Sequence, residues 1–435
     1  MVRRFILVLC VFLLLFILLS FLYVKFTNVR HEQGGKPVYN TNSGIGYNTI
    51  QEAIDAPETK DGNTITVGPG VFHEHLMLRK AVFLNGHSWQ DTIIDGNRDG
   101  TVISVESSAR IEGFTVENGS IGIFVESSNS GRIVDSAVRL NGEGIHLSRS
   151  SNWNISDNSM TNNYDSSLVL NDSDKNVFNK NEVSYDHPIV NDTVDLYNSS
   201  NNEISDNSLI NNQAIAIVLR DHSSNNNVSQ NLLMNDQGGV ELVGSCNHNM
   251  IERNSIIVNE TILGLTPSIW IRQSQFNTVY ANEIMSNRTS STYEIPYEDG
   301  VGLSESTNNV IVSNNISLMD TGIGFHYSCE NNSIIGNTII GNGHGIDFTE
   351  GVSDGNMIYS NNLIHNTEQV HIGSSSNIWD DGYPGGGNYW SDYETRYPNA
   401  TEIDSLGMWS TPYVINSNNM DRYPLQFVVS QNPKR

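Results

Sequence analysis

The chain has 435 residues and a formal net charge of −25, from 48 acidic residues against 23 basic ones. No cluster of Lys and Arg stands out, so nucleic acid is not an expected partner. With 37% hydrophobic and 16% charged residues, the composition is that of a folded chain rather than a disordered one. We interpret the acidic excess as a solvated surface.

An apolar segment follows the first four residues. Residues 5–24 carry no charged side chain, and their length of 20 residues suits a helix that spans a bilayer. Arg3 and Arg4 precede the segment and favour a cytoplasmic N-terminus. The sequence thus predicts a cytoplasmic stub at 1–4, a single-pass transmembrane anchor at 5–24, a linker at 25–42 and a folded region outside the cytoplasm. The alternative is a cleaved signal peptide and a secreted protein.

A short helix is expected after this linker. Thr49 and Glu52 have the spacing of a capping box, in which each side chain satisfies the other residue's backbone N–H. Ile50, Ala53 and Ile54 then form one apolar face. We expect this N-terminal capping helix to cover the open end of the first coil of the structure that follows.

From Ile133 to about Asn377 the sequence repeats in strand-sized pieces. In the clearest unit, residues 334–348, an aliphatic residue is followed by Asn three positions later, and an apolar-x-apolar strand ends the unit. Neighbouring units are roughly 22 to 32 residues apart, which is the range of solenoid repeats. The first apolar anchors of the units are Ile133, Ile155, Phe178, Ile204, Val228, Ile251, Val279, Ile311, Ile334 and Ile358.

The period of the apolar residues decides the architecture. Apolar residues alternate at every second position, as in Ile346 and Phe348, and no helical period persists through a unit. A single coil cannot bury its own apolar side, whereas a stack of coils can. The sequence therefore predicts an all-β fold, a parallel β-helix over residues 43–377 with a C-terminal cap at 378–435.

Asparagine recurs at two positions of the unit. Stacking would place these residues above one another, where their amides can hydrogen-bond along the ladder and fit left-handed turns. We interpret both columns as scaffold rather than as a ligand site. The first column holds Asn158, Asn181, Asn207, Asn231, Asn254, Asn282, Asn314, Asn337 and Asn361. The second holds Asn141, Asn163, Asp186, Asn212, Asp236, Asn259, Asn287, Asn342 and Asn366.

The two ends of the repeat region carry more specific sequences. The entry segment of NosD-like right-handed β-helix proteins resembles three stretches here, Tyr47–Ile54, Thr64–Gly70 and Thr92–Gly96. The closing segment of archaeal surface members of that family is similar to the stretches Gly387–Tyr393, Thr411–Ile415 and Asp421–Leu425. The resemblance covers residues 47–425 and implies that the coils are right-handed.

The same resemblance implies functions. The family shares its fold with carbohydrate-binding and sugar-hydrolysing β-helices, so a polysaccharide or glycan is an implied partner. An enzyme of this kind would be a polysaccharide hydrolase, lyase or epimerase, and the resemblance leaves open whether this chain is one. The named member of the family is a periplasmic accessory factor in copper-site assembly, so the resemblance also suggests copper and an ABC transporter partner.

In the apolar-x-apolar strand, the middle residue and the residue after the second apolar one point outward. Aligned by coil, the middle column is His146, Val169, Asp195, Val218, Glu241, Trp270, Gly302, Gly324, Asp347 and His371. The next outward column is Ser148, Asn171, Tyr197, Arg220, Val243, Arg272, Ser304, His326, Thr349 and Gly373. These columns predict two clusters of polar side chains.

The first cluster contains Asp195, Tyr197, Arg220 and Glu241. Asp195 and Glu241 are two coils apart, near 10 Å by strand spacing, which is compatible with the paired carboxylates of inverting glycosidases. Asp195, Glu241 and Arg220 are therefore the catalytic candidates. Because Arg220 lies between the two carboxylates, the alternative is a surface ion-pair ladder, and this is the arrangement we expect.

The second cluster is the candidate carbohydrate-binding site. Its binding residues are Trp270, His326, Asp347 and His371. Gly302 and Gly324 lie between the indole and the Asp–His pair, and we expect them to leave a dip two coils wide. An exposed ring beside polar groups suits a sugar. The alternative is that the long insertions at 260–267 and 288–299 simply cover this face.

One metal site is also considered. The His73-Glu74-His75 sequence would place both imidazoles on one strand face, which suits copper or zinc, although no third ligand is nearby. The sequence as a whole predicts a membrane-anchored, extracytoplasmic β-helix that binds carbohydrate of the envelope or the environment. A copper-assembly accessory protein and a structural surface spacer are the alternatives.

Overall fold

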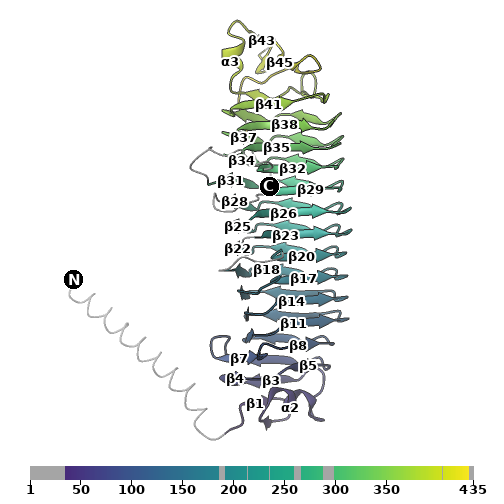
Figure 1. Cartoon of the computed structure of the whole chain (residues 1–435), viewed down its shortest axis with the longest axis vertical. Helices are drawn as coiled ribbons and strands as arrows, with labels where there is room; N and C mark the ends of the chain where they lie inside the picture. Colours follow the sequence, from purple (N-terminus) through teal and green to yellow (C-terminus); the bar gives the residue numbers. More distant parts are fainter. Residues whose placement is uncertain are drawn as a thin grey trace, which may run out of the picture.

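The computed structural model describes residues 35–185, 192–212, 214–234, 236–258, 266–287, 298–403 and 405–430. In these ranges the molecule is a column of stacked coils, with the N-terminal end at the bottom of Figure 1 and the C-terminal segment at the top. The coils build three long parallel sheets, as the repeat predicts. The architecture is an all-β right-handed β-solenoid of about 13 turns.

The predicted anchor at 5–24 lies outside the described residues, as do the stub at 1–4 and residues 25–34 of the linker. Within the described ranges, no helix has the length and apolarity that a membrane crossing requires. The last part of the predicted linker contains a strand, β1 (Val38–Asn40), in which Val38 is fully buried. The folded region therefore begins before residue 43, because this strand pairs with the first coil.

Sheet A is the fifteen-stranded sheet. Its strands are β1, β2 (Ile45–Tyr47), β3 (Thr64–Val67), β6 (Phe83–Gly86), β9 (Arg110–Glu112), β12 (Gly131–Val134), β15 (Trp153–Ser156), β18 (Val177–Asn179), β21 (Glu203–Ser205), β24 (Asn227–Ser229), β27 (Met250–Glu252), β30 (Thr278–Tyr280), β33 (Val310–Val312), β36 (Ser333–Ile335) and β39 (Met357–Tyr359). Only β1 pairs antiparallel, with β2 and β3, so an antiparallel start precedes the stacked coils.

Sheets B and C have fourteen and thirteen strands. Sheet B consists of β4 (Gly70–Phe72), β7 (Thr92–Asp95), β10 (Thr115–Glu117), β13 (Ala137–Arg139), β16 (Ser159–Thr161), β19 (Glu182–Ser184), β22 (Ser208–Ile210), β25 (Leu232–Met234), β28 (Ser255–Val258), β31 (Glu283–Ser286), β34 (Asn315–Ser317), β37 (Thr338–Ile340), β40 (Asn362–Ile364) and β42 (Tyr389–Trp390). Sheet C consists of β5 (Leu76–Leu78), β8 (Thr101–Val105), β11 (Ile121–Glu126), β14 (Glu143–Ser148), β17 (Leu168–Asn171), β20 (Val194–Tyr197), β23 (Ile215–Arg220), β26 (Gly238–Val243), β29 (Ile269–Arg272), β32 (Asp299–Ser304), β35 (Thr321–His326), β38 (His344–Glu350) and β41 (Glu368–Ile372).

The core lies inside the three sheets, because one side of each strand is apolar. Neighbouring coils pair in register, so each predicted anchor faces the next, as Ile133 faces Ile155 and Ile155 faces Phe178. All the predicted anchors from Ile133 to Ile358 are buried. Burial of each such side chain contributes about 1.5–3 kcal/mol, and stacking repeats this gain in every coil.

A short helix, α2 (Ile50–Asp55), lies at the N-terminal end of the stack (Figure 1). The predicted capping box is present: the Thr49 side chain accepts from the Glu52 backbone, and the Glu52 side chain accepts from the Thr49 backbone. The Glu74 carboxylate also accepts the backbone N–H groups of Ile50 and Gln51, each at 2.9 Å. A carboxylate at this end of a helix is favoured by the helix dipole, so the first coil holds the helix in place.

The asparagine columns form continuous hydrogen-bonded ladders. Asn231 shows the pattern of the first column: its Oδ1 accepts from the Asn207 backbone at 3.0 Å, while its Nδ2 donates to the Ile204 carbonyl at 2.9 Å and to Asn254 Oδ1 at 3.0 Å. The scaffold interpretation of this column is thus confirmed. In the second column Asn212 donates to Asp236, whereas Asp186 and Asn259 lie outside the described residues.

A third ladder was not predicted. It runs through Asn176, Asn202, Asn226, Asn249, Asn277, Asn309, Asn332, Asn356 and Asn377. It lies in the turns between sheets C and A, and Asn419 of the C-terminal segment continues it by accepting the backbone N–H of Asn377. Each turn of the solenoid is therefore fastened to the next by side-chain amides as well as by strand pairing.

The C-terminal segment packs on the last coils. It contains α3 (Tyr393–Arg396) and the pairs β43 (Glu402–Ile403) with β44 (Met408–Trp409) and β45 (Tyr413–Asn416) with β46 (Asn419–Asp421). Buried rings dominate this segment, and Trp390 stacks on Tyr413 with ring centroids 3.9 Å apart. The rings continue the apolar core beyond the last complete coil.

Candidate functional site

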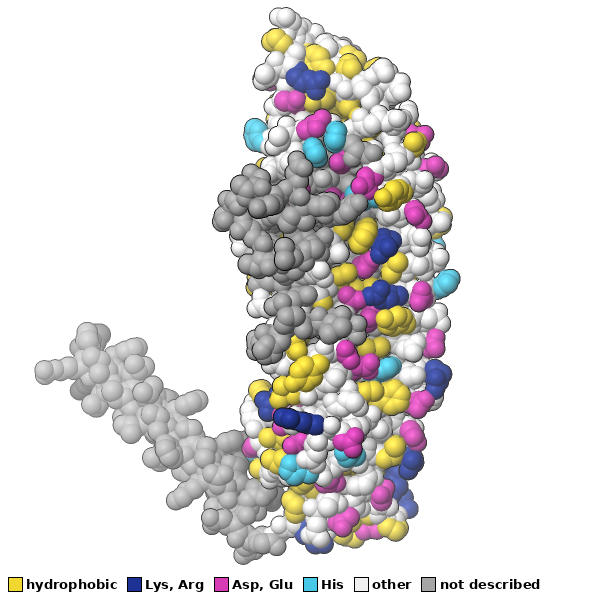
Figure 2. Space-filling model, viewed as in Figure 1, with side chains coloured by type: hydrophobic (Ala, Val, Ile, Leu, Met, Phe, Trp, Pro, Cys, Tyr) yellow, Lys and Arg dark blue, Asp and Glu magenta, His cyan; other side chains and the backbone are white. Residues whose placement is uncertain are grey.

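The outer face of sheet C carries both predicted clusters. The strand register confirms the predicted middle column, since Asp195 faces Val218, Val218 faces Glu241, and Glu241 faces Trp270 on successive coils. The column continues through the two glycines to Asp347 and His371. Figure 2 shows hydrophobic, basic and acidic side chains alternating over these strands.

The second outward column departs from the prediction at one position. Ser304 faces His326 as expected, but the register shifts in β38, and His326 faces Glu350 instead of the predicted Thr349. The cause is a β-bulge: β38 has one residue more than its neighbour over this stretch. The bulge brings an additional carboxylate next to His326.

The first cluster is an ion-pair network, which we call the arginine ladder. It comprises Asp192, Asp195, Tyr197, Arg220, Glu241, Trp270 and Arg272. Arg220 donates to Asp195 at 3.0 Å and also to Asp192, while Tyr197 donates to Asp195 at 3.1 Å. Arg220 therefore pairs with two aspartates rather than bridging Asp195 and Glu241.

Glu241 has its own cation. Arg272 Nη1 donates to Glu241 Oε1 at 2.9 Å, and the same guanidinium lies 4.4 Å from the centre of the Trp270 ring. Asp195 and Glu241 are each only 5% exposed, whereas the side chains of Arg220 and Arg272 are 28% and 42% exposed, so the carboxylates of the ladder are buried and its cations are partly exposed. These contacts are those of the ion-pair ladder that the sequence offers as the alternative to catalysis.

Burial governs the protonation of these aspartates. It raises the pKa of Asp195 to about 6, although the Arg220 charge opposes the shift. It also raises the pKa of Asp192 above the ordinary value, again against the effect of Arg220. The ladder therefore depends on Arg220 to keep two buried carboxylates ionised.

The dip expected at the two glycines is filled. A side chain at Gly302 would meet Pro267 Cγ at 2.8 Å and Asp299 Oδ2 at 3.1 Å, and one at Gly324 would meet Asp299 Cγ at 2.7 Å. The glycines thus make room for the Asp299 carboxylate, which is 3% exposed, and not for a ligand. Trp270 is half-buried, and its indole N–H has no hydrogen-bond partner among the described residues.

His326 lies between two carboxylates. Its Nε2 is 2.6 Å from Asp299 Oδ2, and its Nδ1 is 3.1 Å from Glu350 Oε2. Burial alone would lower the pKa of His326, but its hydrogen bonds to Asp299 and Glu350 outweigh this effect and raise it. Burial raises the pKa of Asp299 as well. His326 and Asp299 therefore share a proton up to a higher pH than the same two side chains would in water.

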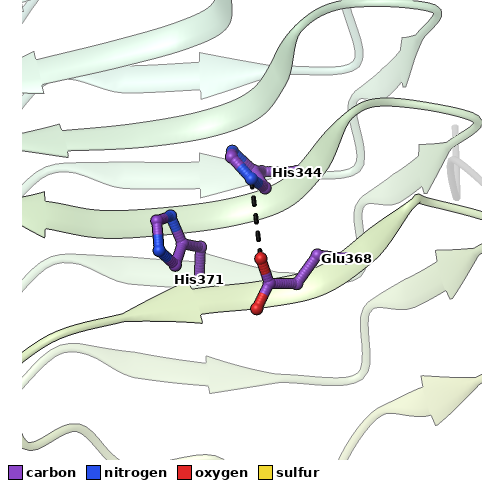
Figure 3. Close-up of side chains that lie close together, drawn as sticks. All are labelled: His344, Glu368 and His371. Atoms are coloured by element: carbon purple, nitrogen blue, oxygen red, sulfur yellow. Dashed lines mark ion pairs between the residues drawn. The ribbon is translucent and has the colours of Figure 1, made fainter.

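The remaining predicted residues join a group that we call the histidine cluster: His344, Asp347, Glu368 and His371. Figure 3 shows three of them, His344, Glu368 and His371. Asp347 Oδ2 lies 3.6 Å from His344 Nδ1 and 3.5 Å from His371 Nδ1. His344 Nε2 lies 3.5 Å from Glu368 Oε2. The structure therefore brings Asp347 and His371 together, while Trp270 belongs to the arginine ladder and His326 to its own pair of carboxylates.

His73 and His75 do not share a strand face. They lie in the connection between β4 and β5, where His73 Nδ1 is 3.5 Å from Asp95 and His75 Nδ1 is 2.8 Å from the Thr101 carbonyl. Glu74 between them holds the start of α2. The shared strand face that suggested a metal site at these two histidines is therefore not found.

Two family models match the chain. Residues 81–256 match the model described as right handed beta helix region, and residues 242–395 match the model described as periplasmic copper-binding protein (NosD). Each model matches less than half of the chain; together with the stacked parallel sheets, the matches show that the chain is similar to NosD-like right-handed β-helix proteins. The resemblance inferred from the two ends of the repeat region is confirmed.

A relative of known description is a cell surface glycoprotein of Methanothermus fervidus, 31% identical over 106 residues. That match covers 24% of this chain and spans only 18% of the relative's length. Among solved structures, the catalytic domain of a GH87 alpha-1,3-glucanase variant in complex with tetrasaccharides has a TM-score of 0.56 at 13% identity, over 79% of this chain and 67% of that one.

A second solved structure is DFA-IIIase from Arthrobacter chlorophenolicus A6 in complex with GF2. Its TM-score is 0.52 at 14% identity, over 66% of this chain and 86% of that chain. At these identities the likeness establishes the fold alone. Function must therefore be argued from the side chains on sheet C.

Some residues of the site were missed. Asp192 and Asp299 lie at or before strand starts, outside the two outward columns. His344 and Glu368 begin β38 and β41 and face each other in the register. A signal was present in the sequence. Gly345–Ile346 and Gln369–Val370 are pairs of consecutive inward residues, and the two residues that flank such a pair both point outward.

Proposed function

We propose that this protein is an extracytoplasmic surface β-helix that binds carbohydrate along the outer face of sheet C. The observation that carries the proposal is the row of aromatic, guanidinium and carboxylate side chains in the arginine ladder. Tyr197 and Trp270 supply ring surface for a sugar face, and the charged groups between them suit hydroxyls. One rung per coil, about 4.8 Å, is close to the length of one sugar ring, so a linear polysaccharide can follow the solenoid axis.

The location outside the cytoplasm belongs to the same proposal. The matched family is described as periplasmic, and the matched relative is a cell surface glycoprotein. The apolar segment at 5–24 supports attachment to the membrane. Neither point depends on the carbohydrate.

Binding rather than catalysis is proposed. Asp195 and Glu241, the catalytic candidates, are each held by a guanidinium and almost completely buried. A general acid or base must reach the scissile bond or an attacking water. In this arrangement Arg220 and Arg272 occupy the donor positions nearest to both carboxylates.

The test is binding of the purified protein to a panel of polysaccharides, followed by calorimetry on any that bind. Trp270→Ala and Tyr197→Ala are expected to weaken binding at least tenfold, because each removes ring surface from the row. Phe427→Ala is the matched control, since Phe427 is 71% exposed and lies in the C-terminal segment. Unchanged affinity in both ladder variants, or no binding to any polysaccharide, contradicts the proposal and leaves the structural spacer as the better account.

A second candidate function is an accessory role in copper-site assembly. One observation favours it: the segment that matches the copper-binding family model, residues 242–395, contains all four residues of the histidine cluster. Copper-dependent association with an ABC transporter would support this function. Carbohydrate binding that is insensitive to copper would favour the first candidate.

A further inference from the structure

The geometry points to a site for one divalent transition-metal ion, formed by His344, Glu368 and His371. One ligand atom from each of these side chains lies within 4.8 Å of the other two. It is the one group of three such residues in the part of the chain that the structure describes. The inference stands on this arrangement and does not depend on the carbohydrate proposal.

Two adjacent coils preorganise the group. His344 faces Glu368 and Asp347 faces His371, so β38 and β41 supply two rungs of polar residues side by side. Figure 3 shows how His344, Glu368 and His371 lie on these strands. Gly345 allows the coils to approach closely, because a side chain there would meet the Gln369 carbonyl at 2.5 Å. The backbone positions of the three ligands are therefore fixed by sheet pairing rather than by a loop.

Asp347 fits the role of a carboxylate that orients both imidazoles. Metal-bound histidines usually direct their second ring nitrogen to a carboxylate or carbonyl. Asp347 Oδ2 lies 3.5–3.6 Å from the Nδ1 atoms of His344 and His371, and the buried His371 Nδ1 has no hydrogen-bond partner among the residues that the structure describes. This arrangement leaves the Nε2 atoms for the ion.

The distances suit an ion after a small closure. Metal bonds of about 2.0–2.2 Å place tetrahedral ligand atoms roughly 3.3 Å apart. His344 Nε2 and Glu368 Oε2 are already 3.5 Å apart. The side chains of Glu368 and His371 are 51% and 45% exposed, so their rotamers can adjust without disturbing the core.

The donor set selects the class of ion. Two imidazoles with one carboxylate suit Zn²⁺ or Cu²⁺, whereas Ca²⁺ and Mg²⁺ prefer sites built from oxygen. The nearby carboxylates of Asp347 and Glu350 add to the negative potential and favour a cation. Open coordination positions remain, because three side chains of the described residues converge on the site.

Calorimetry of the full chain with Zn²⁺ and, separately, Cu²⁺ tests the inference at neutral pH. We expect one equivalent to bind, and both His344→Ala and His371→Ala to weaken binding at least a hundredfold. Glu368→Gln should weaken it less. With Cu²⁺, electron paramagnetic resonance should show coupling to two nitrogen nuclei that drops to one in either histidine variant.

Two controls separate this site from non-specific binding by histidine. His248→Ala removes an exposed histidine elsewhere, and the double variant His73→Ala/His75→Ala removes the pair considered from the sequence. Both should retain the equivalent of bound metal. Loss of binding in the double variant, equal loss in His248→Ala, or no saturable binding of either ion overturns the inference. Circular dichroism of each variant verifies that the fold is intact.

Discussion

Replacing Asp236 with Asn is expected to raise the thermal unfolding temperature of the protein at pH 7. Asp236 occupies a place in an asparagine ladder, where its Oδ1 accepts from the Asn212 backbone at 2.8 Å and from Asn212 Nδ2 at 3.0 Å. Its Oδ2 is buried and has no hydrogen-bond partner in the described part of the chain. At the matching place in the first column, the amide of Asn231 donates to a backbone carbonyl of the preceding coil, so Asn at 236 supplies a missing donor.

The pH dependence of this effect has a definite sign. Burial raises the pKa of Asp236 to about 8, above the unfolded value near 3.9. Between these values the folded protein holds a proton that the unfolded chain has released, so the free energy of unfolding falls as pH rises, by about 1.4 kcal/mol per unit. The stability gain in Asp236→Asn at pH 7 is thus on the order of 2–4 kcal/mol, and it should shrink toward pH 5.

Scanning calorimetry at a series of pH values between 5 and 8 measures this. The reciprocal variant Asn231→Asp is the matched control, because it places a carboxyl oxygen against the Ile204 carbonyl and the Asn254 side chain. It should lower the unfolding temperature and introduce the same pH slope. A wild-type protein and an Asp236→Asn variant with equal slopes would show that Asp236 is not protonated in the fold.

Replacing Arg220 with Leu is expected to destabilise the protein strongly at pH 8. The substitution leaves Asp195 and Asp192 without their shared cation, in a setting where Asp195 is 5% exposed. Removing one partner from a buried ion pair costs on the order of 3–5 kcal/mol, because the other charge stays buried.

The loss should be smaller at pH 5. In the wild-type protein the pKa of Asp195 is already raised to about 6, and without Arg220 it rises further. At pH 5 the Asp195 carboxyl of the variant is therefore protonated, and the cost of a buried unpaired charge disappears. Arg149→Leu is the control, since its pair with Glu126 is largely exposed and should contribute at most about 1 kcal/mol. Urea midpoints of the three proteins at the two pH values decide the matter; equal losses in both variants would mean that the ladder is not energetically coupled.

The repeat period determined the coil alignment, and the outward column from Asp195 to His371 follows directly from it. The reason is that a residue in a parallel stack can have only one neighbour on the next coil once the apolar anchors are in register. The two asparagine columns followed for the same reason. The third column lies in the turns that precede sheet A, and its residues from Asn176 to Asn356 each stand two positions before the apolar anchor of their coil. The sequence therefore carried the signal for this column as well.

Side-chain partners were less predictable. The sequence placed Arg220 between Asp195 and Glu241, yet a guanidinium can reach several carboxylates, and Asp192 before the strand competed for it. The glycines at 302 and 324 indicated open space, but Asp299 at the start of its strand turns back over them. Register fixes the backbone positions, whereas long side chains and strand ends choose among several neighbours.

The amide ladders also bear on how such a rod changes in length. Asn254, Asn282 and Asn314 accept equivalent bonds although their coils differ in length, because the surplus residues fall between strands in the sequence. Gain or loss of one whole coil by tandem duplication or deletion would therefore leave every ladder continuous. The length of the solenoid and the side chains on the outer face of one sheet can therefore change independently in evolution. The length depends on the number of coils, whereas the chemistry of the face depends on a few outward positions.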